Sequence, residues 1–488
     1  MPPLRPTSPA AVAASRQVWT LFAIGLAISL WMVARSQVGG DQLNLLARGW
    51  LLAEEGTWIS YGNPMSTGGK APGGITSVLV GLPLFLWKDH RAATLLVLLF
   101  HVAGYLILDG TLKRIIAPRE RVLFSLLYWL NPWRLYFSAF LWNPNYLFLF
   151  GALHLWSCLV QRERARFWPS FLHGVGLVLA FQIHASFLLL VVASGLLWLR
   201  GYWKPHWTAG IVGGLLAAVP LVPWAFDLAK DPAILTEADK GFLGRGLLYV
   251  FPLLRGLLYW LRYASMALSE KIALFDFSDL LGHEDRHLGP AVTAGLRVVL
   301  SLTLIFPLLA NVWLWRRRGR GWFKRLAPEA SSRTWLEGYA LWSFLAAALV
   351  FSLSPTTIMM WQALLLLHAA VLPVVLWAGA LGRTRRRPLV EKGMRIYALA
   401  EVALLIVIAL GSPQYRCKGH DPQGRDSFFF PLRSDHPMFH ELGIQETCPW
   451  PLNQPGKWWP DVLPEGGKAQ HGPTRTSTDP QGRTPRSP

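Results

Sequence analysis

Residues 36–74, SQVGGDQLNLLARGWLLAEEGTWISYGNPMSTGGKAPGG, form the first polar stretch of the chain and follow its first long apolar run. The segment Asp41–Glu55 has helical periodicity with two distinct faces. The apolar face carries Leu43, Leu46 and Trp50. The polar face carries Asp41, Asn44 and Arg48. Between membrane segments, such a helix is expected to lie in the interface plane with its apolar face toward the lipid.

The composition is that of a polytopic membrane protein. The 488 residues are 52% hydrophobic and 15% charged, whereas about 25% of residues are charged in a typical soluble protein. Apolar runs close to the roughly 20 residues that span a bilayer recur along the chain. We therefore expect an all-α fold of transmembrane helices.

The net charge of +19 is explained by the topology of the chain in the membrane. Its basic residues gather in short clusters between apolar runs: Lys113–Arg121, Arg162–Arg166, Arg316–Arg325 and Arg383–Arg387. Basic loops of this kind stay in the cytoplasm. The charge is therefore assigned to topology and not to nucleic-acid binding.

If all basic clusters are cytoplasmic, about eleven spans alternate correctly, with the N-terminus inside and the C-terminus outside. This count requires Ile75–Trp87 to be an interfacial or re-entrant helix. The expected organisation is a cytoplasmic leader 1–16, a transmembrane catalytic module 17–226, an outer loop with interfacial helices 227–290, transmembrane helices 291–411, and an outer tail 412–488 that is disordered from about 466.

This topology brings the polar breaks of the chain to the outer face, where a water-filled cavity is expected. Asp41 is the candidate catalytic carboxylate; the alternative is that it only caps the amphipathic helix. Lys70, in a Gly/Pro-rich loop, is a candidate contact for a donor phosphate, or simply a solvated loop residue. Arg255 and Arg262 share one helical face and are either a second phosphate clamp or snorkelling interfacial arginines.

Two further breaks supply candidate substrate-binding side chains. Asn143 and Asn145, in LWNPN, form either a helix corner or a pair of amides that bind sugar hydroxyls. Gln182 and His184, in FQIHAS, are polar residues at membrane depth, which are functional candidates by default. The alternative is that they are paired within the protein.

Other motifs limit the chemistry. No P-loop, dinucleotide fingerprint or nucleophile elbow occurs, which argues against an ATP-driven or redox enzyme. The cluster at 283–287 matches no specific metal motif, so no cofactor is expected, and a divalent metal has no positive support. Cys417 and Cys448 either form a disulfide, if the tail lies outside the cytoplasm, or share the tail by coincidence without being bonded.

The order of these motifs resembles the bacterial GT-C glycosyltransferases of the protein O-mannosyltransferase and aminoarabinose-transferase superfamily, over roughly residues 17–226. In that family the first outer loop supplies an acidic residue to the site, and Asp41 matches it. Gln42, a candidate substrate contact, stands where many members have a second acidic residue. Lys70 is similar to the loop lysine that contacts the donor phosphate in the aminoarabinose transferases.

The resemblance implies an inverting transfer of a sugar from a polyprenyl-phosphate carrier to a lipid, glycan or protein acceptor. It also implies a site on the outer, periplasmic face of a bacterial inner membrane. The alternatives are a transporter or flippase of lipid-linked sugars, and a polymerase or ligase of surface polysaccharide. A transporter is expected to show internal repeats and buried charges in its central helices. The two halves of the chain show no such repeat.

Overall fold

The computed structural model describes residues 9–36, 38–65, 69–232, 250–268, 288–318, 321, 324–327, 329–411, 430–431, 436–447 and 460–463. In these residues the fold is a helical bundle with two small antiparallel sheets, β1–β2 and β3–β4. The expected all-α, polytopic architecture is confirmed. The disulfide candidates Cys417 and Cys448 and the start of the disordered tail at 466 lie outside the described residues.

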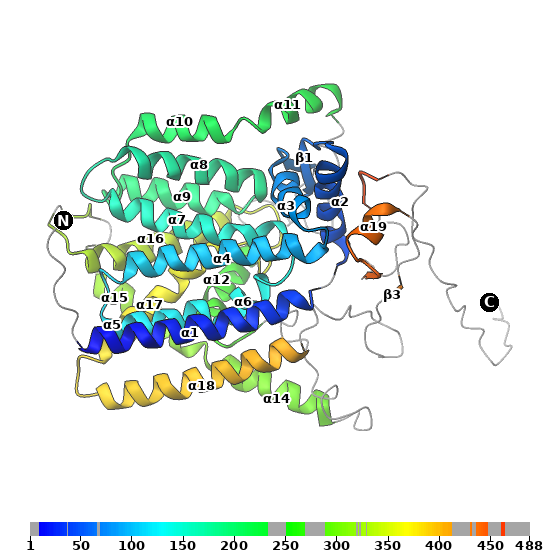
Figure 1. The fold of residues 1–488 in the computed structure, drawn as a ribbon. Helices are drawn as coiled ribbons and strands as arrows, with labels where there is room; N and C mark the ends of the chain where they lie inside the picture. Colours follow the sequence, from blue (N-terminus) through cyan, green and yellow to red (C-terminus); the bar gives the residue numbers. More distant parts are fainter. Residues whose placement is uncertain are drawn as a thin grey trace, which may run out of the picture.

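The elements follow one another along the chain as shown in Figure 1. The first half contains α1 (Pro9–Ala34), α2 (Gly40–Glu55), β1 (Tyr61–Pro64), β2 (Lys70–Pro72), α3 (Ile75–Leu86), α4 (His90–Leu112), α5 (Pro118–Phe124), the π-helical turn η1 (Ser125–Trp129), α6 (Pro132–Phe137), the 3₁₀ turn η2 (Asn143–Tyr146), α7 (Leu147–Val160), α8 (Phe167–Ile183), α9 (Phe187–Leu199), α10 (Trp207–Ala217) and α11 (Leu221–Lys230). The second half contains α12 (Val250–Tyr263), α14 (Leu288–Leu302), α15 (Ile305–Arg318), α16 (Ser332–Ser352), the 3₁₀ turn η5 (Leu364–Leu366), α17 (Leu367–Leu381), α18 (Arg387–Gly411), β3 (Phe430–Pro431), α19 (Pro437–Glu441) and β4 (Glu446–Thr447).

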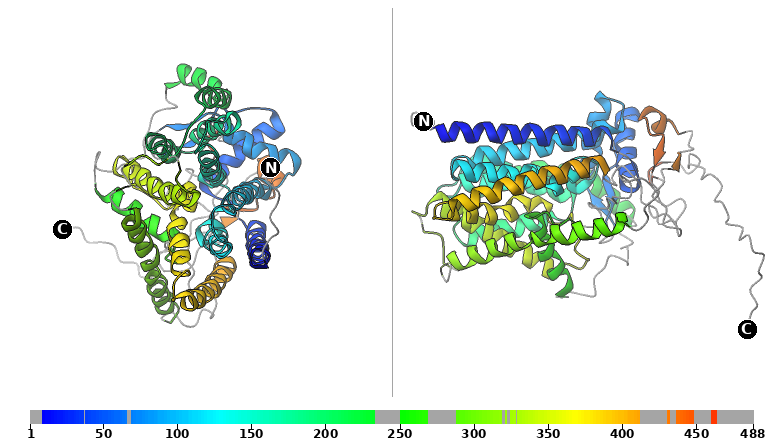
Figure 2. Two further views of the ribbon diagram at one scale, coloured as in Figure 1. Left: turned by 90° about the vertical axis from the view of Figure 1, so that its left-hand side faces the viewer. Right: turned by 90° about the horizontal axis from the view of Figure 1, so that it is seen from below.

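The two ends of the bundle differ in character. Figure 1 shows α2, α3, β1, β3 and α19 together at one end, opposite the end at which α1 begins, and Figure 2 shows the same separation from below. We call these the site end and the basic end. The loops that leave α4, α7 and α17 carry three of the four basic clusters to the basic end.

Helix α3 begins and finishes at the site end. Its 12 residues reach about 18 Å, well short of the roughly 30 Å hydrocarbon core. The segment after it also stays there, since the amide of His90 donates to the carbonyl of Leu442, next to α19. This agrees with the expectation that Ile75–Trp87 does not cross the membrane.

Several expected spans are interrupted. Five described helices are long and apolar enough to cross a membrane, or six if α10 and α11, bent by 55°, form one span. This is fewer than the expected eleven, because the runs 146–160, 171–183 and 186–199 form the shorter helices α7, α8 and α9, of 14, 17 and 13 residues. The run 122–142 breaks at Asn131–Pro132, where the proline begins α6. The run 359–381 becomes helical only at Leu364 but still supplies one of the five spans.

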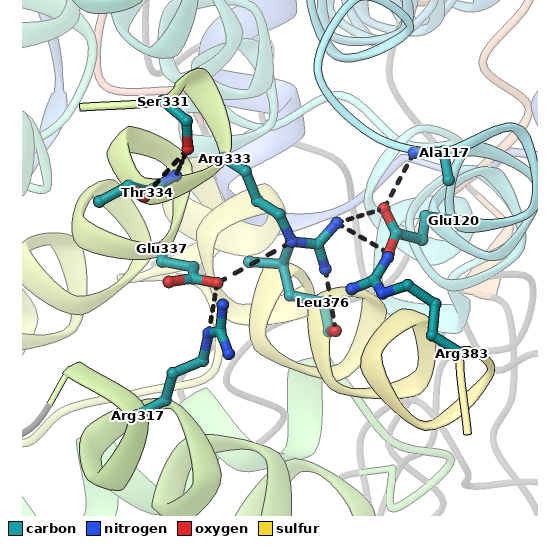
Figure 3. A network of polar contacts seen from close by, with 9 residues as sticks. All are labelled: Ala117, Glu120, Arg317, Ser331, Arg333, Thr334, Glu337, Leu376 and Arg383. Atoms are coloured by element: carbon teal, nitrogen blue, oxygen red, sulfur yellow. Dashed lines mark hydrogen bonds and ion pairs between the residues drawn. The ribbon is translucent and has the colours of Figure 1, made fainter. Parts of the chain in front are cut away.

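A network of ion pairs holds the basic end together (Figure 3). Glu120 of α5, whose side chain is 2% exposed, accepts from Arg333 of α16 at 2.8 Å and from Arg383, beyond α17, at 3.2 Å. Glu337 of α16 accepts from Arg317 of α15 at 2.8 Å. The two carboxylates thus join four helices or their loops. Buried charges are stable only when paired in this way.

We expect Glu120→Gln to lower the thermal melting point in detergent, followed through the intrinsic fluorescence of the 25 tryptophans. Arg333 and Arg383 would lose their carboxylate, and the free energy of unfolding would fall by roughly 3 kcal/mol. This value is at the low end for a buried ion pair, because Arg383 stays partly solvated. Glu391→Gln is the matched control, because Glu391 pairs with arginines at the surface. Equal melting points for the two variants would contradict the role given to Glu120.

Candidate active site

Helix α2 carries the candidate catalytic residue across the site end, at a large angle to α1 and α4 (Figure 1). The helix begins after Gly39, which is the N-cap, so Asp41 lies in the first turn. The alternative in which Asp41 caps this helix is therefore wrong. A carboxylate in the first turn is still favoured by the helix dipole. The apolar face, with Leu43, Leu46 and Trp50, is buried in the protein core, so it does not face the lipid as the sequence predicted.

The Asp41 carboxylate is reached by solvent although protein surrounds it on most sides. Its Oδ2 accepts a hydrogen bond from Nε1 of Trp142 at 2.9 Å. Desolvation raises the pKa of this carboxyl above its usual 3.8, and the Trp142 hydrogen bond and the Arg48 charge offset part of that rise. An accessible carboxylate with a raised pKa is suited to accept a proton.

Aromatic rings connect Asp41 to the second half of the chain. The ring of Trp142 packs edge-on against that of Trp361, with 4.7 Å between their centroids. Phe137 and Phe140 also stack on Trp142. Trp361, in the irregular segment 359–362 before α17, therefore reaches Asp41 through Trp142; we call 359–362 the wall segment.

Arg48 fixes the polar face of α2. Its side chain has no exposed surface, and its guanidinium donates to the carbonyls of Asn44 and Tyr61 at 3.0 and 3.3 Å. It also binds both oxygens of Asp461, at 2.8 and 3.0 Å. Asn63 accepts from Arg48 at 3.4 Å and donates to the carbonyl of Asp41 at 3.0 Å. Arg48 therefore joins α2, β1 and the chain near 461.

Lys70, at the start of β2, shares the Asp461 carboxylate with Arg48. Its Nζ lies 2.9 Å from Asp461 Oδ2 and 4.3 Å from the centre of the Tyr61 ring. Burial alone would raise the pKa of Asp461, but the Arg48 charge and the Lys70 hydrogen bond outweigh it, so the pKa is lowered. Two cations and an aromatic face thus form an anion site that holds a carboxylate here.

Asp41 and Lys70 lie in one local structure but do not contact each other. Asp41 faces Trp142, whereas Lys70 faces Asp461. Asn63 and Arg48 connect them through the hydrogen bonds described above. The expectation that both residues belong to one site is compatible with this arrangement, in which the acid and the cation have different partners.

The LWNPN break is a helix corner. Asn145 has no exposed surface; its Nδ2 donates to the carbonyl of Phe140 at 2.8 Å, and its own carbonyl is bonded to His101 at 2.9 Å. Asn143 is 7% exposed. Asn145 therefore stabilises the helix corner, which is the alternative to sugar binding that the sequence left open for this residue. The residue of this motif that reaches Asp41 is Trp142.

Gln182 and His184 lie at the end of α8. Gln182 is buried and donates to the carbonyl of Ala217 at 2.7 Å, and a Cβ added at Gly73 would come within 2.5 Å of its Oε1. Gly73 also has φ 79°, so this close approach requires glycine. Gln182 therefore positions the loop that follows Lys70.

His184 is half-buried, and burial lowers its pKa to about 4, so the imidazole is neutral near pH 7. Its Nδ1 accepts from the backbone amide of Ser186 at 3.1 Å. A neutral imidazole that accepts at Nδ1 carries its proton on Nε2. His184 is thus arranged to donate a hydrogen bond.

Arg255 and Arg262 lie on α12, whose C-terminal end contacts the wall segment. Arg255 lies 3.3 Å from the sulfur of Met359, and the hydroxyl of Tyr263 donates to the carbonyl of Met360 at 2.7 Å. Both arginines approach the ring of Tyr259, at 5.9 and 5.6 Å. The segment that packs against Trp142 therefore also contacts the helix of these two cations.

Sequence reasoning missed three residues of this site: Trp142, Trp361 and Asp461. Trp142 directly precedes the candidate Asn143, whereas Trp361 and Asp461 are far in sequence from the candidates, and nothing local marks any of the three as a partner of Asp41 or Lys70. In the described part of the chain, no group of three or more His, Cys, Asp or Glu side chains could hold a metal. The cluster at 283–287 lies outside that part.

No family model matches the chain, and no curated protein matches its sequence. Two crystal structures of ArnT from Cupriavidus metallidurans are similar to it. The apo structure has a TM-score of 0.44 at 16% identity, over 83% of this chain and 78% of that one. The structure bound to undecaprenyl phosphate has a TM-score of 0.43 at 15% identity, over 82% and 77%.

Proposed function

We propose that this protein is an inverting membrane glycosyltransferase that moves a sugar from a polyprenyl-phosphate carrier to an envelope acceptor on the outer face of a bacterial inner membrane. The observation that carries the proposal is Asp41: an accessible carboxylate at the end of the bundle opposite the basic loops, with a raised pKa. The basic loops assign their own end to the cytoplasm and the site end to the outside.

In the proposed reaction, Asp41 removes the proton of an acceptor hydroxyl as its oxygen attacks the anomeric carbon. The new bond to that oxygen forms on the face opposite the departing phosphate, which gives inversion. The bond between the anomeric carbon and the phosphate oxygen breaks, and polyprenyl phosphate leaves with the electron pair. Trp142 holds the carboxylate in place through its 2.9 Å hydrogen bond.

The departing phosphate requires a cation, and Lys70 is the residue we assign to it. Its present partner, the Asp461 carboxylate, occupies the place of an anion between Lys70 and Arg48. A donor phosphate at Lys70 would therefore compete with Asp461. Arg255 and Arg262 are assigned to the same donor phosphate as further cations, since α12 contacts the segment 359–362 that packs against Trp142.

For the sugar we assign Gln42 and Asn143, with His184 as a hydrogen-bond donor. Gln42 follows Asp41 on α2, and Asn143 follows Trp142. Both are partly or largely buried beside the Asp41–Trp142 contact. Asn145 and Gln182, although also candidates from sequence, are assigned to positioning these segments because neither has exposed surface.

One observation favours the alternative of a transporter or flippase. Three buried histidines form a continuous network inside the bundle, in which Tyr339 bridges His154 and His368 at 3.0 and 2.9 Å, and Ser194 bridges His154 and His173 at 3.1 and 2.9 Å. Polar groups at membrane depth are often functional. These rings satisfy one another, however, as a structural network would. The other alternative, a polymerase or ligase of surface polysaccharide, would use the same site at Asp41.

The function is tested by mass spectrometry of envelope glycolipids and glycans from cells with and without the protein. A glycan that loses one sugar identifies donor and acceptor together. A glycan that loses this sugar while the lipid-linked sugar accumulates on the cytoplasmic side, and not on the outer side, would instead identify a flippase.

We expect Asp41→Asn to reduce transfer by about 10²- to 10⁴-fold, the usual contribution of a general base. Membrane abundance should be unchanged, since an amide can still accept from Trp142. The matched control is Glu54→Gln, on the same helix but on its exposed side. Transfer by Asp41→Asn at more than a few per cent of wild type would exclude Asp41 as the base.

Trp142→Phe should move the acid limb of the pH–rate profile to higher pH. The Trp142 hydrogen bond favours the charged carboxylate, so its loss raises the already elevated pKa of Asp41. Phe137→Leu, which alters the same aromatic cluster without a hydrogen bond, is the control. A loss of rate at all pH values, with no shift of the limb, would assign Trp142 to packing alone.

Asp461→Asn should tighten binding of undecaprenyl phosphate, measured by microscale thermophoresis in detergent, because a competing anion is removed from Lys70. Lys70→Met should weaken it by a larger factor. Weaker binding by Asp461→Asn would show that this carboxylate supports Lys70 and does not compete with the donor, and unchanged binding by Lys70→Met would mean that the donor phosphate binds elsewhere.

A further inference from the structure

The basic end of the bundle contains a cavity of about 620 Å³ between α4, α7 and α8. This volume lies within the roughly 300–1,000 Å³ typical of ligand sites. The cavity is at the opposite end from Asp41 and contains none of the residues assigned to glycosyl transfer. The cavity therefore has no part in the proposed reaction, and an inference about its ligand can be tested independently of the proposed function.

The lining changes from apolar to charged along the helices. On α4 and the turn that follows, Leu106, Gly110 and Arg114 are spaced four residues apart and line the cavity in that order toward the basic end. On α7, Leu153, Trp156 and Val160 give it an apolar second wall. A ligand that fits has an apolar part directed into the bundle and an anionic part at its end.

The charged end of the cavity is basic and partly held in place. Arg114, Arg162 and Arg166 line it against one carboxylate, Glu163, which leaves a net charge of +2. Arg162 donates to the Ser332 hydroxyl and binds Glu163 at 2.7 Å, so its guanidinium is fixed. Within the described residues no ion pair engages Arg114, which is exposed and lines the cavity.

Gly110 keeps the middle of the cavity open. A Cβ added at this position would meet no atom within 4 Å, although the residue lies inside α4. A larger side chain there would extend into the cavity without displacing backbone. The apolar half therefore has free width at the depth at which an acyl chain would enter.

We propose that this cavity binds an anionic phospholipid of the membrane leaflet at the basic end, with the phosphate on Arg114, Arg162 and Arg166 and an acyl chain along Leu106, Gly110 and Trp156. Basic pockets between transmembrane helices on the cytoplasmic side are suited to anionic headgroups. A free phosphate would use only the charged half, whereas a phospholipid uses both halves.

The test uses the full-length protein in nanodiscs of equimolar phosphatidylglycerol and phosphatidylcholine, with retained lipids identified by native mass spectrometry. Wild type should retain phosphatidylglycerol preferentially. Arg114→Gln combined with Arg166→Gln should reduce that preference roughly tenfold to thirtyfold, the combined contribution of two arginines. Arg385→Gln combined with Arg386→Gln removes the same charge from the same end, outside the cavity, and should change nothing.

Gly110→Leu distinguishes binding of a phospholipid from binding of a simple anion, because the leucine fills the apolar half of the cavity and leaves every charge in place. We expect it to lose phosphatidylglycerol while its melting point stays at the wild-type value or rises. Retention of the lipid by Gly110→Leu, equal losses in the two double variants, or displacement of the lipid by excess inorganic phosphate would each overturn the proposal.

Discussion

The site end depends on one buried charge, the guanidinium of Arg48. An arginine with no exposed surface is stable only if its donors are paired, and here they bind two carbonyls, an asparagine and a carboxylate. These partners lie on α2 itself, on β1 and near residue 461. Satisfying Arg48 therefore fixes α2 against β1 and the residues near 461, and Asp41 and Lys70 take their places as a consequence.

Irregular backbone next to a membrane must satisfy its own polar groups, and this requirement separates supporting residues from reactive ones. Asn145 and Gln182 lie at breaks between helices, and their side-chain amide nitrogens donate to neighbouring carbonyls. Trp142 lies at the same kind of break but directs its donor to a carboxylate that solvent reaches. Burial, rather than residue type, distinguishes the two groups of candidates.

The sequence was informative wherever a signal was local. The two faces of Asp41–Glu55, the short helix after it and the gathering of basic loops at one end all follow from periodicity, length and charge. The breaks at Pro132 and before Leu364 interrupted runs whose hydropathy is continuous, so composition concealed them. The partner of Arg48 and Lys70 could not be found, because Asp461 is 413 residues from Arg48 and stands in a tail with no periodic pattern.

The position of Asp41 resolves a conflict between reactivity and ionisation. Desolvation makes a carboxylate a stronger base, but taken too far it leaves the group protonated and useless near neutral pH. The Trp142 hydrogen bond and the Arg48 charge oppose that rise without covering the carboxylate. Because Trp142 packs on Trp361, and Arg48 on β1 and Asp461, the two moderating contacts come from segments far apart in the chain. The basicity of Asp41 is thus set by the closure of the fold around it and not by α2 alone.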